Sequence, residues 1–290
     1  MLETMSAPFD GMEIARQRIA EEAEARTGFL DLGGLGLTAL PPELFELRHL
    51  RTLNLGAGIR REDGSYHVAY RPWEDAAPRN DLAAQLASLR QLSDLVALSV
   101  SATPIDDLTP LAGFCALQSL DCSYTQVSDL TPLAGLTTLQ SLYCSGTQVS
   151  DLTPLSGLAA LQSLSCGSTQ VSNLTPLSGL AALQSLYCSG TQVSDLTPLA
   201  GLAALRRLDC SNCVLGALPE AVRDLSSLQR LTLFHTRIPG VPAEALSQGY
   251  RDNCLAAVRA HFQDLQAGQA TVIDVKLIVL GNGRVGKTQI

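Results

Sequence analysis

LQSLYCSGTQVSDLTPLSGLAA, the stretch Leu139–Ala160, recurs with few changes on both sides of itself. Near-identical copies occupy Leu117–Thr138, Leu161–Ala182 and Leu183–Ala204, so the period is 22 residues without an insertion. A fixed period of about 20 to 50 residues is typical of repeat architectures, in which each unit packs against its neighbours. The sequence therefore predicts a stack of similar units rather than one globule.

Looser copies extend this block in both directions. Leu95–Ala116 precedes it, and Leu205–Ser227 and the segment from Leu228 follow it with a 23-residue spacing. Near the N-terminus, Phe29–Leu47 and Leu50–Leu55 fit the same frame. Because one unit cannot bury its own leucines, we expect about eight units to stack across residues 27–249.

The unit reads L-x-x-L-x-[LC]-x-x-[TC]-x-V, which resembles the leucine-rich repeat LxxLxLxxN/CxL. Its fourth and sixth positions alternate with polar residues as in a short strand, so Leu120 and Cys122 face inward and Asp121 faces outward. The SDLTPL tail suits a short turn that begins near a proline. The resemblance implies an α/β leucine-rich-repeat solenoid: a curved parallel β-sheet with a short helical or 3₁₀ convex side, an N-terminal helical cap and a C-terminal connecting helix.

Three columns of polar or small residues recur in register. Where the family places Asn or Cys to bond unpaired backbone groups, this chain has Thr103, Thr125, Thr147, Thr169, Thr191, Cys213 and Thr236. A threonine hydroxyl makes fewer hydrogen bonds than an asparagine amide, so we expect a weaker polar ladder. A second column either caps the turns or binds cations, and consists of Asp129, Asp151, Asn173 and Asp195. The third packs as core thiols or forms a disulfide or metal stack, and consists of Cys122, Cys144, Cys166, Cys188 and Cys210.

Three segments lie outside the repeat pattern. Residues 1–26 predict an amphipathic helix that either covers the first repeat or binds a partner, with one side formed by Phe9, Met12, Ala15, Ile19 and Ala23. Residues 56–81 interrupt the period and contain Tyr70 and Trp73 among arginines, so this insertion is either a binding loop or tolerated drift. Residues 250–270 predict a connecting helix that ends at Gly268, with one face formed by Leu255, Val258, Phe262 and Leu265.

The concave face presents the third, fifth and seventh positions of each repeat. In the middle repeats these positions are small and neutral, and those repeats contain no Lys or Arg. A nucleic-acid backbone requires cations, so we reject nucleic acid as a ligand of this face. Tyr143 and Tyr187 either anchor a protein partner or are surface side chains without a binding role. Positive charge gathers toward the C-terminal end, where Arg207 and Arg230 with Phe234 form either a docking surface or a solvated edge.

Residues 271–290 no longer follow the repeat pattern. Val275–Leu280 (VKLIVL) predicts a buried strand, and Gly281–Thr288 (GNGRVGKT) follows it directly. This segment matches the pattern G-x-x-x-x-G-K-[ST], which forms a loop whose backbone N–H groups surround a phosphate. In such a loop Lys287 would reach the β- and γ-phosphates, and Thr288 would ligate Mg²⁺. The candidate nucleotide-binding residues are Gly281, Gly283, Arg284, Val285, Gly286, Lys287 and Thr288.

Repeats, then a helix, then a strand with a phosphate loop: this order resembles the Roco family, in which a Ras-like GTPase domain (Roc) and a dimerising COR domain follow leucine-rich repeats. The resemblance implies a regulatory module of a homodimeric GTPase that uses GTP and Mg²⁺, with its own Roc–COR domains or another protein as partner. The chain departs from this pattern at Ile290, because a switch region, a Walker-B Asp and guanine-reading residues are missing. We therefore expect a truncated Roc domain with no cofactor and no catalytic residue, in a fragment that can be monomeric. The alternative is a free-standing repeat protein with a non-functional loop remnant.

Composition further narrows the classes of protein to which this chain can belong. The 290 residues carry a net charge of −8, which argues against a generally basic nucleic-acid binder. Only 4% are aromatic, so Leu, Val and Cys must fill the core. No apolar run approaches the ~20 residues of a membrane span, and residues 1–26 lack an apolar secretory region. The eight cysteines therefore predict a reducing, cytoplasmic location, where thiols stay free.

Overall fold

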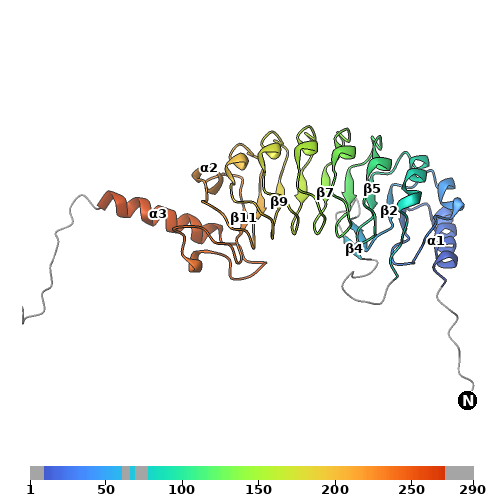
Figure 1. The fold of residues 1–290 in the computed structure, drawn as a ribbon, viewed down its shortest axis with the longest axis horizontal. Coiled ribbons are helices and arrows are strands. Elements are labelled where there is room, and N and C mark those ends of the chain that lie inside the picture. The colour runs from blue at the N-terminus through green and yellow to red at the C-terminus, as the bar shows by residue number, and fades with distance from the viewer. Residues whose placement is uncertain (1–9, 61–65, 69–77, 272–290) are drawn as a thin grey trace, which may run out of the picture.

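The computed structural model describes residues 10–60, 66–68 and 78–271. Within these ranges, nine strands form one parallel sheet in the order β1-β2-β5-β6-β7-β8-β9-β10-β11. Figure 1 shows the repeats side by side along the long axis of the molecule, with their short helical turns in one row. The sheet has one strand more than the roughly eight repeats we expected, because each of the nine copies found in the sequence supplies a strand. The predicted leucine-rich-repeat solenoid is confirmed.

The strands are three residues long and recur with the repeat. They are β1 (Phe29–Asp31), β2 (Thr52–Asn54), β5 (Ala97–Ser99), β6 (Ser119–Asp121), β7 (Ser141–Tyr143), β8 (Ser163–Ser165), β9 (Ser185–Tyr187), β10 (Arg207–Asp209) and β11 (Arg230–Thr232). The strands pair in register, so the central leucine of each strand faces its counterpart, as Leu142 faces Leu164. These leucines are buried, which places the core directly behind the sheet.

Short 3₁₀ turns cover the convex side, as the TPL sequences predict. Five of them, in the regular repeats, span Thr109–Leu111, Thr131–Leu133, Thr153–Leu155, Thr175–Leu177 and Thr197–Leu199. Three less regular ones span Pro42–Glu46, Ala83–Gln91 and Ala243–Ala245. A carboxylate or amide oxygen accepts a hydrogen bond from the first backbone N–H of the regular turns, as Asp129 Oδ1 does from Thr131 N at 2.7 Å. The aspartate column therefore caps turns.

The threonine and cysteine columns both stabilise the repeat interior. Thr147 Oγ1 donates to the carbonyl of Cys144 at 2.6 Å, and the other threonines of the column likewise donate to backbone carbonyls. The five cysteines of the column are buried and free, so the core-thiol interpretation is confirmed. Burial raises the pKa of the Cys166 thiol to about 12, which keeps it protonated and apolar in character.

The N-terminal helix α1 (Gly11–Ala25) covers the first repeat, as a solenoid end requires. Asp10 caps it by accepting from Met12 N and Glu13 N. Ala15 and Ile19 face the core as predicted, whereas Phe9 lies outside the described residues. The prediction for Ala23 is wrong: it is exposed, and Glu22 takes the inward position because backbone and side-chain donors surround its carboxylate.

The insertion leaves the sheet after β2 and forms a separate hairpin of β3 (Gly58–Arg60) and β4 (Tyr66–Val68). Gly56 is required at its start, because a Cβ there would lie 2.3 Å from the backbone nitrogen of Ser101. The insertion returns at Asn80, a buried side chain that donates to the carbonyls of Leu32 and Leu55, each at 2.8 Å. The candidate residues Tyr70 and Trp73 lie outside the described residues.

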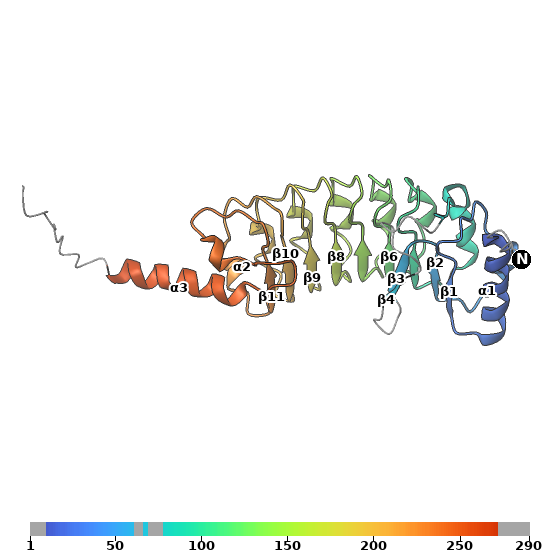
Figure 2. The same ribbon diagram turned by 90° about the horizontal axis from the view of Figure 1, so that it is seen from below.

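The C-terminal end has α2 (Glu220–Arg223) and α3 (Leu255–Thr271). In Figure 2, α3 continues past the last strand and away from the stack. Two predictions for this helix are wrong: it continues through Gly268, and Leu265 is 46% exposed, because the distal turns of α3 extend past the repeats that bury Leu255 and Val258. Among the helices of the described segments, none is both long and apolar enough to cross a bilayer.

Candidate functional site

The concave face is nearly featureless in its middle. Its side chains there are mainly serines, with Tyr143 on β7 and Tyr187 on β9 as the large groups. Strand β8 separates these two strands, so the tyrosines stand two strand spacings apart, roughly 10 Å. The structure does not bring the two predicted tyrosines into one site.

A pocket forms instead where the face ends, at the last three strands. It has a volume of about 210 Å³, and its lining residues are Tyr187, Arg207, Leu208, Asp209, Arg230, Thr232 and Tyr250. Three of the predicted residues, Tyr187, Arg207 and Arg230, therefore meet in it. They do so because β9, β10 and β11 are neighbours: Arg207 and Arg230 hold the same position of their strands, and Tyr187 is paired with Asp209, two residues after Arg207.

Tyr250 closes this pocket from a segment that follows the last repeat. The segment pairs with the free edge of β11: Ser247 Oγ accepts from Leu233 N at 3.0 Å, and Asn253 Oδ1 accepts from Leu231 N at 3.1 Å. Asn253 Nδ2 also donates to the carbonyl of Gln229 at 2.8 Å. These bonds satisfy the edge strand and hold the segment that carries Tyr250 against the sheet.

The repeat pattern does not predict Tyr250 as a site residue, because Tyr250 belongs to no repeat and adjoins the connecting helix in sequence. The available signal was the pair of short polar residues, Ser247 and Asn253, which suit side-chain pairing with an unpaired strand edge.

Phe234, another predicted residue, lies beside the pocket and supports Tyr250. The two rings meet edge to face with centroids 4.5 Å apart, and Phe234 stacks on His235 at 3.9 Å. Tyr250 itself is 61% exposed. An exposed aromatic ring held by its neighbours is a rigid contact group, which loses little conformational entropy when it binds.

The polar groups of the pocket are mostly donors. Within the described residues, Arg207 has no ion-pair or side-chain hydrogen-bond partner. Arg230 Nη2 donates to the carbonyl of Arg251, which orients the guanidinium. Asp209 Oδ1 is already engaged by Ser211, whose N and Oγ donate at 2.9 and 2.6 Å.

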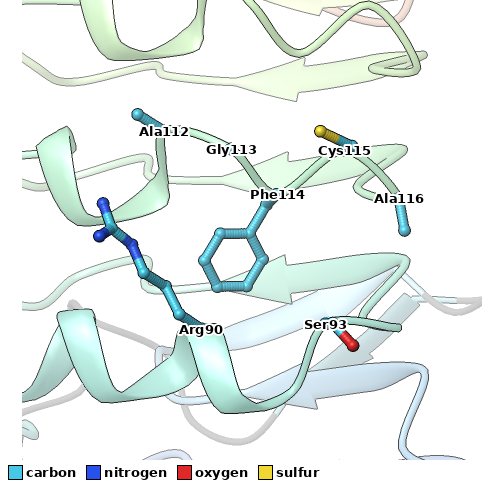
Figure 3. Close-up of a pocket in the computed structure, with 7 residues that line it drawn as sticks. All are labelled: Arg90, Ser93, Ala112, Gly113, Phe114, Cys115 and Ala116. Carbon is cyan, nitrogen blue, oxygen red and sulfur yellow. The ribbon is translucent and has the colours of Figure 1, made fainter.

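A second hollow lies where two repeats meet before β5 and β6. It has a volume of about 490 Å³ and is lined by Arg90, Ser93 and residues 112–116, with the ring of Phe114 at its centre (Figure 3). Arg90 already donates from Nε to the carbonyl of Pro110 at 3.1 Å. Its remaining walls are backbone and small side chains, so we assign no ligand to it.

The nucleotide-binding residues Gly281–Thr288 lie outside the described residues. In the part of the chain that the structure does describe, no three His, Cys, Asp or Glu side chains are grouped as a metal site would require. The geometry therefore offers the concave-face pocket as the candidate site.

Comparisons with known proteins agree with the fold. A family model described as leucine rich repeats (two copies) matches residues 115–157 and again 159–201. Internalin C2 of Listeria monocytogenes is similar with a TM-score of 0.61 and 26% identity, over 78% of this chain and 92% of that one. Two other structures resemble the fold alone. A second internalin of L. monocytogenes has a TM-score of 0.52 and 21% identity, over 82% of this chain and 81% of its own. A leucine-rich-repeat protein of Leptospira interrogans has a TM-score of 0.57 and 18% identity, over 83% of this chain and 62% of its own. No curated protein sequence matches significantly.

Proposed function

We propose that this leucine-rich-repeat domain binds a protein partner with the C-terminal end of its concave face. The observation that carries the proposal is the pocket in which Tyr187, Arg207, Arg230 and Tyr250 converge. Tyr and Arg are the side chains that most often dominate the binding energy of protein interfaces. The small, neutral middle of the face would then lie alongside the partner and add little energy.

The test is partner capture with quantitative mass spectrometry, comparing the wild type with Tyr187→Ala/Tyr250→Ala. A true partner loses at least tenfold in recovery with the double variant, since each anchor contributes about 2 kcal/mol. Tyr143→Ala is the matched control, because it removes a tyrosine of the same face two strands away. An equal loss with Tyr143→Ala would place the site in the middle of the face and contradict the proposal.

We also propose that the domain regulates a Roco-type GTPase, whose Roc domain would begin with Val275–Leu280. Support comes from the phosphate-loop pattern Gly281–Thr288 and from Leu265, an exposed leucine on α3 that a following domain would cover. In that parent Lys287 would bind the phosphates of GTP and Thr288 would ligate Mg²⁺. The proposed parent is a cytoplasmic homodimer whose Roc and COR domains are further candidate partners.

Calorimetry with GTP and Mg²⁺ tests the Roco proposal on two chains. We expect no measurable affinity for the 290-residue chain, and micromolar affinity for a chain extended by the residues its gene encodes next. Lys287→Ala should abolish that affinity. An extension without a DxxG motif and a guanine-reading motif contradicts the proposal, and a stop codon after Ile290 favours the free-standing repeat protein instead.

A further inference from the structure

We propose that the concave-face pocket binds the carboxylate of one Asp or Glu side chain in an extended segment of the partner. This inference rests on the proposed function and specifies the chemistry of the partner. The pocket is small. At about 210 Å³ the pocket is smaller than the roughly 300–1,000 Å³ of sites for drug-sized ligands, so it suits a single side chain rather than a cofactor.

Hydrogen-bond donors dominate the charged groups of the pocket. Arg207 offers five N–H groups, and nothing in the described part of the chain uses its guanidinium. Tyr250 Oη accepts from Asn212 Nδ2 at 3.3 Å, which leaves the hydroxyl proton free to donate. Asp209 is the acidic group in the lining, and Ser211 already occupies one of its oxygens. The N–H groups of the two arginines therefore outnumber the carboxylate oxygens of the lining, and a ligand with acceptor oxygens can use the surplus.

The geometry and the charge of the arginines both suit a carboxylate. A guanidinium presents paired donors in a planar fork that matches the two oxygens of a carboxylate. Two arginines against one aspartate give the pocket a net positive charge, so a basic side chain is disfavoured. The carboxylate of Asp209 also stands in the pocket, and it would repel a dianionic phosphate more strongly than a carboxylate with one charge.

The surroundings favour an acidic segment as well. Arg206 and Arg251 are exposed and adjoin the lining residues Arg207 and Tyr250 in sequence, whereas the middle repeats contain no basic residue. Positive charge is thus absent from the middle repeats and returns at this end of the concave face, in a chain whose net charge is −8. Such a local field steers an acidic segment to this end of the face and away from the middle repeats.

Selection from a phage-displayed library of random peptides tests the inference with the intact chain as bait. We expect wild type to enrich Asp or Glu at one position by at least tenfold. Arg207→Glu should replace this preference with Lys or Arg at the same position, because it reverses the charge that the peptide meets. Arg206→Glu is the matched control: the charge change is the same, but the residue does not line the pocket, so the acidic preference should persist.

A selected peptide and its Glu→Gln version then measure the contact directly. The peptide change should weaken binding at least tenfold with wild type and less than twofold with Arg207→Ala. Enriched peptides without an acidic position, a preference for phosphoserine in a phosphopeptide array, or equal behaviour of Arg207→Glu and Arg206→Glu would each overturn the inference. These outcomes leave the proposed function standing, since partner capture with Tyr187→Ala/Tyr250→Ala decides that separately. A wild-type chain that enriches no peptide also overturns the inference.

Discussion

Replacing Glu22 should release the N-terminal helix from the first repeat. The Glu22 side chain is only 5% exposed and accepts four hydrogen bonds. Thr27 donates from N at 3.2 Å and from Oγ1 at 2.5 Å, Gly28 N donates at 2.7 Å, and His49 Nε2 lies 2.9 Å away. His49 belongs to the next repeat, so this carboxylate joins the cap to the solenoid.

The expected loss in the free energy of unfolding follows from the hydrogen-bonding groups that the substitution leaves without a partner. Glu22→Ala removes the acceptor of two backbone N–H groups in a partly buried turn, at about 1–3 kcal/mol for each unsatisfied group. We expect a loss of about 2–4 kcal/mol for Glu22→Ala and about half of that for Glu22→Gln, which keeps one acceptor oxygen. Because each repeat contacts only its neighbours, the loss should appear locally rather than throughout the stack.

Hydrogen–deuterium exchange measures this local loss. With Glu22→Ala, amides of α1 and β1 should exchange faster, while those of β7 and β8 should not change. Glu24→Ala is the matched control, because Glu24 is exposed on the same helix. Unchanged protection of α1 in Glu22→Ala would refute the argument that this carboxylate anchors the cap.

The same group predicts an acid sensitivity of the cap. Burial alone would raise the pKa of Glu22, but the hydrogen bonds from Thr27, Gly28 and His49 outweigh it and lower the pKa below its ordinary value of 4.5. A carboxyl whose pKa is lower in the folded state stabilises that state above the unfolded pKa, and the contribution disappears as the pH falls through the folded pKa. Protection of α1 should therefore decline below about pH 4.5 in wild type, and this pH dependence should be much weaker in Glu22→Gln.

Five further variants at four positions test the core, the backbone and α3. Leu164→Ala in the buried centre of β8 should cost about 2–5 kcal/mol in urea unfolding, and Leu164→Asp should unfold the middle repeats; unchanged stability would move this leucine out of the core. Tyr124→Gly should stabilise the chain by about 1 kcal/mol, because Tyr124 has a φ of 58° and is 56% exposed; a lower melting temperature would contradict this. Asn80→Ala should cost about 2–4 kcal/mol by orphaning two buried carbonyls, and faster exchange in β1 and β2 is the expected sign. Leu265→Arg should leave the stability of this chain within about 0.5 kcal/mol, whereas a large loss would show that the repeats cover that face of α3.

The repeat pattern predicts most of the fold because its physics is local. Leu142 and Cys144 face inward by the alternation of a strand, and the same alternation in the next repeat puts Leu164 and Cys166 directly beside them. One correct unit therefore predicts the register of the whole sheet and which side chains lie on each of its two faces. Even the threonine ladder follows, since Thr147 bonds a carbonyl only three residues away.

The candidate site was predictable only in part. Tyr187, Arg207 and Arg230 occupy repeat positions, so their shared face could be read from the period of the sequence. Tyr250 reaches the pocket through contacts between the segment that carries it and the edge of β11, and no periodicity relates those two segments. The arginines at this end of the face are apparent in the sequence. The position of Tyr250, which closes the pocket over them, is not.

Periodic burial of leucine, valine and cysteine thus specifies the solenoid, because every unit gains its stability by packing against a neighbour of the same pattern. Contacts between unlike segments decided the rest. Glu22 is buried because donors from a turn and from the next repeat surround it, and Asn80 is buried because it bonds a carbonyl 48 residues earlier in the chain. Such polar contacts depend on the positions of particular donors and acceptors in space, and a linear pattern of hydrophobic residues carries no information about those positions.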